Sequence, residues 1–280
     1  MEVVYNLLEA VLPFDFMTYS FMKNAFLAII LISPIFAILG TMIVNNKMAF
    51  FSDALGHSAL TGIAIGMLFG LGNVNLSMII FAIIFAILLN MVKHKTTYGA
   101  DTIISVFSSI AIALGLAMLS KSGNFTKYSS YLVGDILSIT TNEIIYLFIA
   151  FVLTLIFWKF FFNKLNCVSI NQTLAKSKGI NAQVIDNIFV VIIAVIVMIS
   201  IRWIGILLIN SLLILPAASS RNISNNMRSY HAFSIAFSFF SGITGLVISY
   251  YCDMPTGPTI VIISGIIYFI SFALKGRVKE

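Results

Sequence analysis

The sequence predicts an all-α, polytopic integral membrane protein, and its composition and its apolar runs both lead to that class. Of its 280 residues, 60% are hydrophobic and only 9% are charged, whereas a soluble domain carries about 25% charged residues. The apolar residues gather in runs of spanning length, because a hydrocarbon core about 30 Å thick needs roughly 20 helical residues. Lipid offers a backbone no hydrogen-bonding partners, so these runs are expected to be helices.

Nine apolar runs are long enough, or nearly long enough, to cross a membrane. In chain order they cover residues 24–44, 48–71, 74–92, 102–120, 143–163, 184–201, 203–220, 231–250 and 258–274. We therefore expect about nine transmembrane helices, with eight as the alternative if 184–220 is one broken helix or one short run is re-entrant. The connections are too short for a soluble domain, so residues 1–280 are expected to form a single transmembrane domain.

The basic residues predict how these helices are oriented. The net charge of +6 is spread over short connections and forms no patch, which argues against nucleic acid as a partner. Segments rich in Lys and Arg are expected in the cytoplasm, and here they are Lys93 with Lys95, residues 159–178, Arg221 with Arg228, and residues 275–279. This places the N-terminus outside and the C-terminus inside, and it requires two crossings within 184–220, with a turn near Arg202 and Trp203.

The stretch "FSDALGHSALTG" at 51–62 puts charge into an apolar helix. A spacing of four residues places Asp53, His57 and Thr61 on one helix face. If this helix starts near Asn46, Asp53 and His57 lie about 10 and 16 Å along it, at about 1.5 Å per residue. We expect both side chains near the middle of the bilayer, where ionisable residues generally have a function.

The chemistry of this pair leaves several interpretations open. A carboxylate oxygen and an imidazole nitrogen are ligands for zinc, manganese or iron(II), and two ligands suit a transient site that another helix, a second subunit or water completes. A proton relay fits the same residues about as well, and a structural Asp–His ion pair is the third interpretation.

Small residues form a second ridge on the same helix, at a spacing of four: Ala54, Ser58, Gly62, Gly66 and Gly70. Small-xxx-small ridges allow close helix packing, so this helix is expected to clasp a neighbour beside its polar face. Asn210 and Ser211 lie mid-run near Pro216, and we expect them to pack helices more readily than to bind a cation. His94 lies in a basic connection and is expected to be solvated or to lie among the lipid headgroups rather than to act as a ligand.

The connection "SINQTLAKSKGINAQVID" at 169–186 predicts a short amphipathic helix that ends at Gly179 before helix resumes. Taken alone it is an ordinary basic connector, although it also suits the docking of a cytoplasmic partner.

These segments together resemble the permease family of ABC importers for zinc, manganese or iron. The resemblance covers residues 23–274 in the family's order. It rests on "SDALGHSALTGIAIG" (52–66), "VGDILSIT" (133–140), "LAKSKGIN" (174–181), "IGILLINSLLILPAA" (204–218) and "MPTGPTIVIIS" (254–264). No one of these motifs is specific by itself, but the set is. Asp135 and Lys178 depart from the family's usual residues.

The resemblance implies a type II ABC importer-like fold and a homodimer in the inner membrane of a bacterium, with the path of the cation near the dimer axis. Asp53 and His57 match the family's metal-interacting pair; Thr61, Ser58, Gly62, Gly66, Asn210 and Ser211 are assigned to the pathway or to helix packing. Two copies of a cytoplasmic ATPase would dock near 169–183, on Leu174, Ala175, Lys176, Lys178, Gly179 and Ile180. An extracytoplasmic solute-binding protein would deliver the cation, and no permanently bound cofactor is expected.

The chain is not expected to be an enzyme. It has no G-x-x-x-x-G-K-[ST] motif, so ATP would be hydrolysed by a separate subunit. Three other classes remain as alternatives. A proton-coupled secondary metal transporter would use the same Asp–His pair, a permease for bulky metal chelates shares the general architecture, and a non-transporting membrane scaffold would have no use for the polar ridge.

Overall fold

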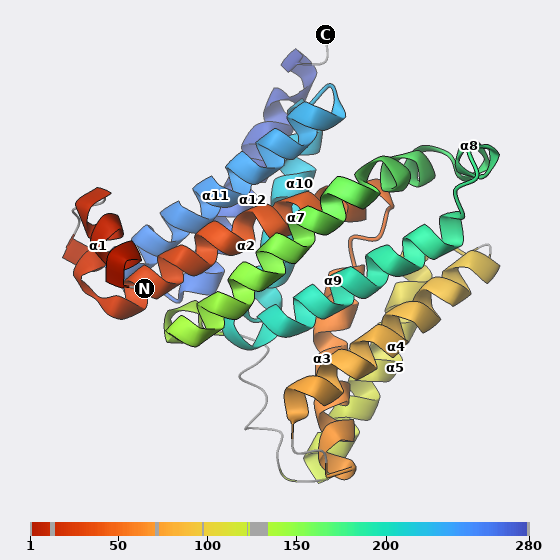
Figure 1. The fold of residues 1–280 in the computed structure, drawn as a ribbon, viewed down its shortest axis with the longest axis horizontal. Coiled ribbons are helices and arrows are strands. Elements are labelled where there is room, and N and C mark those ends of the chain that lie inside the picture. The colour runs from red at the N-terminus through yellow and green to blue at the C-terminus, as the bar shows by residue number, and fades with distance from the viewer. Residues whose placement is uncertain are drawn as a thin grey trace. The chain divides into compact units, whose positions relative to one another are not determined.

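The computed structural model describes residues 2–11, 15–70, 73–96, 98–121, 123 and 134–278. Over those residues every regular element is a helix (Figure 1). The nine long ones are α2 (Ser20–Asn45), α3 (Phe51–Leu68), α4 (Val74–Lys95), α5 (Ala100–Lys121), α7 (Thr141–Ile170), α9 (Ala182–Ile204), α10 (Ile206–Ile223), α11 (Met227–Tyr251) and α12 (Thr256–Val278). The short ones are α1 (Glu2–Val11), η1 (Asp15–Thr18), η2 (Ile136–Ser138) and α8 (Gln172–Ser177).

Each of the nine long helices lies on one of the nine predicted apolar runs. Within the described part of the chain, eight are long and apolar enough to cross a membrane. The exception is α3, an 18-residue helix whose hydropathy is lowered by Asp53, His57 and its small and hydroxyl residues. The predicted class, an all-α polytopic membrane protein, is confirmed.

The region 182–223 contains two helices with a single residue between them. Gly205 has φ 78° and ψ 159°, a conformation that glycine adopts without steric cost. Because this backbone cannot continue a helix, α9 ends at Ile204 and α10 begins at Ile206. The predicted turn therefore falls at Gly205, while Arg202 and Trp203 belong to the last turn of α9.

The chain divides into two compact units, which we describe separately. The first contains Met1–Thr41, Gly134–Ile156 and Ser211–Glu280. Its helices α2 and α10 touch backbone to backbone, since a Cβ on Gly40 would lie 1.8 Å from the carbonyl oxygen of Leu213. Helix α11 joins them through Ser234, whose hydroxyl donates to the Ala37 carbonyl over 3.1 Å.

The second unit contains Met42–Val133 and Phe157–Asn210, so α3, α4, α5, α8 and α9 belong to it (Figure 1). Asparagine side chains begin three of its helices by accepting backbone N–H groups that would otherwise lack partners: Asn73 caps α4, Asn171 caps α8 and Asn181 caps α9. The helices α2, α7 and α10 each contribute residues to both units. That residues 1–280 form a single transmembrane domain remains a prediction.

Candidate functional site

Asp53 and His57 lie on one face of α3, where the spacing of four residues placed them. The Nε2 atom of His57 is 3.5 Å from Oδ1 of Asp53, and the two side chains are 35% and 45% exposed. Their neighbours on the other faces of α3, including Ala54 and Ser58, are buried. The pair is therefore accessible to a small ligand, although it is part of a helix that is mostly enclosed by protein.

The expected start of this helix was wrong. A turn occupies residues 46–50, where Lys47 has a φ of 54° and the Met48 amide donates back to the carbonyl of Ile43. Helix α3 begins only at Phe51. With a rise of about 1.5 Å per residue, Asp53 and His57 lie about 3 and 9 Å from its start, not 10 and 16 Å. Asp53 thus occupies the first turn, where the helix dipole favours a negative charge.

Asn210 of α10 joins this pair. Its Nδ2 atom donates to Oδ1 of Asp53 over 2.7 Å, so one carboxylate oxygen faces both the amide and the imidazole. Its own Oδ1 is buried and accepts no hydrogen bond from any described residue. The sequence indicated Asn210 as a polar residue in the membrane but gave no sign of its partner. Ser211, the next residue, is 6% exposed and is assigned to the other unit.

The small residues of α3 pack against α4. A Cβ on Gly62 would lie 2.8 Å from the Cα atom of Met78, and one on Gly66 would lie 2.6 Å from the Cβ of Ser77. The hydroxyl of Ser77 also donates to the Gly62 carbonyl over 2.7 Å. Gly70 lies beyond the end of α3, in the left-handed region with φ 63°. This close contact fixes α3 on α4.

Thr61 lies in a different environment from Asp53 and His57. It is 1% exposed, and its hydroxyl donates to the Ala111 carbonyl of α5. Gly115 of α5 approaches it so closely that a Cβ there would lie 2.6 Å from the threonine hydroxyl oxygen. Ser58 is also buried and bonds within its own helix, to the carbonyl of Leu55. Thr61 therefore packs α3 against α5, whereas the hydroxyl of Ser58 is bonded within α3.

The protein ligands of the Asp53–His57 site are few. In the described part of the chain, no group of three or more His, Cys, Asp or Glu side chains could hold a metal ion. A carboxylate, an imidazole and the free amide oxygen of Asn210 could supply at most part of a coordination shell.

The predicted short helix before Gly179 is present as α8. It ends in a Schellman motif: Gly179 has φ 72°, the Ile180 amide donates to the Ala175 carbonyl over 2.9 Å, and the Gly179 amide donates to that of Lys176 over 3.0 Å. This arrangement satisfies the last carbonyls of a helix. Leu174, Lys176 and Lys178 are exposed, whereas Ala175 is fully buried. The segment presents basic side chains and one leucine on a rigid turn.

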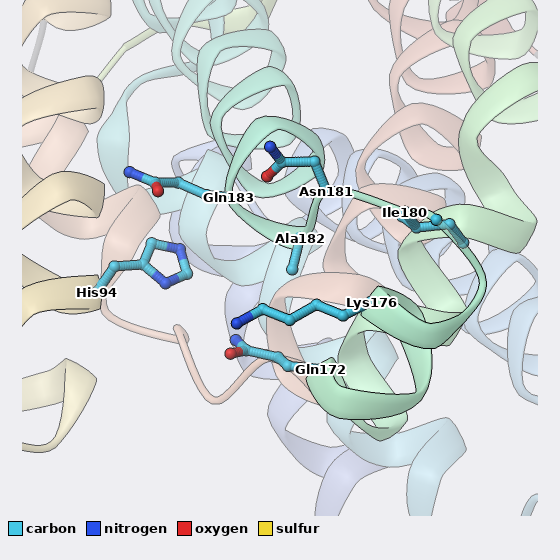
Figure 2. A pocket seen from close by; sticks show the side chains of 8 residues that line it. His94, Gln172, Lys176, Ile180, Asn181, Ala182 and Gln183 are labelled. Carbon is cyan, nitrogen blue, oxygen red and sulfur yellow. The ribbon is translucent and has the colours of Figure 1, made fainter.

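A pocket of about 530 Å³ lies beside this segment (Figure 2). Lys176 and Gln172 line it from α8, Asn181 and Gln183 from the start of α9, and His94 from the end of α4. The expectation that His94 is solvated was wrong, because its Nε2 is 3.2 Å from Oδ2 of Asp186 and its side chain is only 18% exposed. The sequence could not reveal this contact, since its two residues are far apart along the chain.

Comparison with known proteins decides the family. The model of the ABC 3 transport family matches residues 18–275, which is almost the whole chain. The chain belongs to the ABC 3 transport family. It is the membrane permease subunit of a bacterial ABC uptake system, a multi-pass protein whose ATPase is a separate protein and whose other partner is a binding protein.

Similar proteins support the same assignment. The chain is 31% identical over 254 residues to the high-affinity zinc uptake system membrane protein ZnuB of Haemophilus influenzae, covering 90% of this chain and 97% of that one. It is 25% identical to the manganese transport system membrane protein MntC of Listeria monocytogenes, with 91% of each chain covered. Among solved structures, PsaBC from Streptococcus pneumoniae in complex with Fab matches with a TM-score of 0.78 and 25% identity, covering 97% of this chain and 95% of that one.

Proposed function

We propose that this ABC 3 permease carries a divalent transition-metal cation, zinc or manganese, into the cytoplasm, and that Asp53 and His57 contact the cation on its way. The observation that carries the proposal is the 3.5 Å separation between the Asp53 oxygen and the His57 nitrogen. A cation about 2.1 Å from each atom in tetrahedral geometry would hold them about 3.4 Å apart. The zinc and manganese relatives support the choice of substrate class.

The two side chains have different tasks in this proposal. Asp53 supplies negative charge and His57 a neutral nitrogen, so a proton on the imidazole competes with the cation. Asn210 holds the carboxylate through the 2.7 Å hydrogen bond that it donates to Oδ1, as hydrogen-bonded neighbours commonly orient metal ligands. An incomplete shell suits transport, since a cation held by two protein ligands and water leaves more readily than one in a closed site.

The partners complete the cycle. We propose a homodimer in which two copies of the ATPase dock on residues 174–181, while a binding protein delivers the cation on the outer side. ATP-driven closure of the ATPase pair moves the 169–183 segment and exposes the site to alternate sides of the membrane. The hydrogen-bonded Schellman turn at Gly179 supports this role, because a docking segment must keep its conformation while it moves.

Uptake of radioactive zinc and manganese into liposomes tests the proposal. The liposomes contain the permease with its ATPase inside and its binding protein outside. We expect ATP-dependent uptake that Asp53→Ala and His57→Ala abolish. The matched controls are His231→Ala on α11 and Asp253→Asn in the turn between α11 and α12, which change residues of the same types outside the site and are expected to leave uptake intact.

Two results would contradict the proposal. Unchanged uptake by Asp53→Ala and His57→Ala would remove these residues from the path. Uptake that follows a proton gradient and needs no ATPase would mean that the chain works as a secondary transporter.

A further inference from the structure

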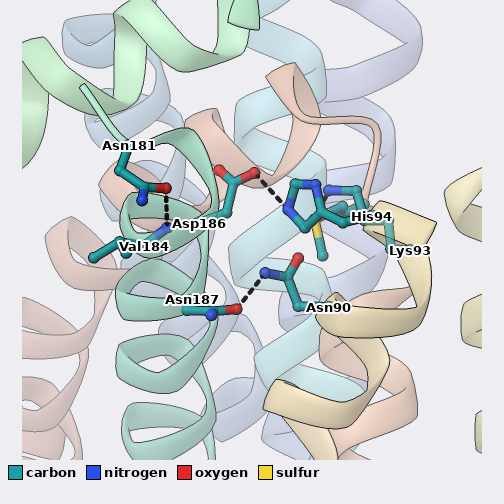
Figure 3. A network of polar contacts seen from close by, with 8 residues as sticks. Asn90, Lys93, His94, Asn181, Val184, Asp186 and Asn187 are labelled. Atoms are coloured by element: carbon teal, nitrogen blue, oxygen red, sulfur yellow. Dashed lines mark hydrogen bonds and ion pairs between the residues drawn. The ribbon is translucent and has the colours of Figure 1, made fainter. Parts of the chain in front are cut away.

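A second group of ionisable side chains lies at the end of α4 and the start of α9 (Figure 3). The Asp186 carboxylate of α9 is 3.2 Å from Nε2 of His94 on α4, and Asp186 is only 5% exposed. Lys93 precedes His94, and its ammonium contacts Sδ of Met48 at 3.1 Å. The buried carboxylate of α9 therefore pairs with an imidazole of α4.

A hydrogen bond between two uncharged side chains lies next to the His94–Asp186 pair and joins the same two helices, α4 and α9. Nδ2 of Asn90 donates to Oδ1 of Asn187 over 2.7 Å, and Asn90 is fully buried. Asn90 and His94 are one turn apart on α4, while Asn187 follows Asp186 on α9 (Figure 3). Two polar contacts thus fasten the end of α4 to the beginning of α9.

The His94–Asp186 and Asn90–Asn187 contacts lie beside the proposed docking segment, residues 174–181. Only residues 178–181 separate α8 from α9, and the His94 side chain lines the same pocket as Lys176 and Gln172 of α8 (Figure 2). Helix α4 in turn packs on α3 through Met78 and Gly62. Packed or bonded contacts therefore connect the docking segment to α9, then to α4 and then to the helix that carries Asp53 and His57.

A gain in folding stability does not by itself explain why His94 and Asp186 are paired inside the protein. Charges lose hydration when they are buried, and well-packed apolar side chains often replace a buried ion pair with no loss of stability. A buried polar pair can, however, define the register of two helices, because displacement would leave the buried carboxylate without its partner.

We propose that the His94–Asp186 pair is a coupling latch, which makes the end of α4 move with the docking segment and thereby passes ATP-driven movement to α3. The inference rests on the proposed function, since it requires the ATPase to dock near α8. His94 and Asp186 are positioning residues in it and do not touch the cation.

The number of cations imported per ATP hydrolysed tests the latch. It is measured in the reconstituted complex for His94→Ala, Asp186→Ala and the double variant. We expect each single variant to keep the ATPase bound and hydrolysing while the ratio falls by about twofold to thirtyfold, the range typical of residues that transmit coupling. If the contact itself carries the effect, the double variant is no worse than the worse single variant.

Two further sets of variants make the result specific. Asp186→Asn and His94→Gln replace the alanines where those prevent folding, because they keep the approximate size of each side chain and remove the carboxylate or the imidazole. Ser271→Ala is the matched control. It removes a buried contact between helices, the 3.1 Å bond donated by Asn222 in the other unit, and it is expected to leave the ratio unchanged.

The outcomes separate the latch from the proposed function. An unchanged ratio in the variants overturns the latch, as does a double variant whose loss is the product of the single losses. Loss of ATPase binding by the variants also overturns it, since the pair would then build the docking surface. Failure of the wild-type complex to import zinc or manganese overturns the proposed function instead.

Discussion

Replacement of Asn210 by alanine is the sharpest test of how the cation site is held. The substitution removes the hydrogen bond that Nδ2 donates to Oδ1 of Asp53 over 2.7 Å and leaves both candidate ligands in place. Without it, the Asp53 carboxylate, which is nearly half exposed, is free to rotate away from His57. Cation binding should then weaken, because in Asn210→Ala the cation has to order the Asp53 side chain itself, which makes the binding free energy less favourable.

The size of the effect follows from the type of bond. A hydrogen bond to a charged group contributes about 1.5–3 kcal/mol, and about 1.4 kcal/mol corresponds to a factor of ten in affinity. Asn210→Ala is therefore expected to weaken cation binding by roughly 10-fold to 100-fold, a range also typical for the loss of a residue that orients a metal ligand.

Equilibrium binding of radioactive zinc to the purified permease measures this effect, and it is done without the binding protein, whose own affinity would mask the change. Asn222→Ala is the matched control because it removes an amide of the same helix that bonds outside the site, to Ser271. The control is expected to lower thermal stability and keep the affinity. If Asn210→Ala binds zinc as tightly as wild type, or more tightly, the amide does not hold the carboxylate for the cation.

Three more predictions follow from the geometry. Gly40→Ala would place a Cβ 1.8 Å from the Leu213 carbonyl oxygen. Because main-chain atoms cannot rotate away as a side chain can, we expect the free energy of unfolding to fall by about 3 kcal/mol. An unchanged unfolding temperature would contradict this packing. Cation binding should weaken as pH falls, because a proton and the cation compete for the His57 nitrogen; binding that is equally tight at acid and neutral pH would argue against that ligand. Leu174→Asp should stop the ATPase from co-purifying without harming the fold, since Leu174 is 45% exposed, and a normal yield of complex would exclude Leu174 from the docking surface.

The helices could be predicted from the sequence because lipid imposes their length and their hydrogen bonding. The nine apolar runs therefore coincide with nine helices, even though α3 is less apolar than the rest. The errors concern helix ends, which depend on local backbone conformation. Lys47 adopts a left-handed conformation with φ 54°, which hydropathy could not indicate, so the expected start of the helix near Asn46 was five residues before the start of α3 at Phe51.

The site was predictable only where its residues share a helix. Asp53 and His57 are four residues apart, and helical geometry alone brings them together. Asn210 is 157 residues from Asp53, and His94 is far in sequence from Asp186, so these contacts depend on tertiary packing that no periodicity reveals. Thr61 is the opposite case. It is four residues from His57 and was expected on the same polar face, but α5 covers its side chain.

The central claim is that the Asp53–His57 pair of α3 holds the transported cation. Zinc K-edge X-ray absorption of the zinc-loaded permease tests it most directly, because the spectrum identifies an imidazole ligand by its nitrogen at about 2.0–2.1 Å and the scattering from its ring. We predict that this signal is present in the wild type and in His231→Ala and is lost in His57→Ala. An imidazole signal that persists in His57→Ala would place the cation elsewhere and contradict the account.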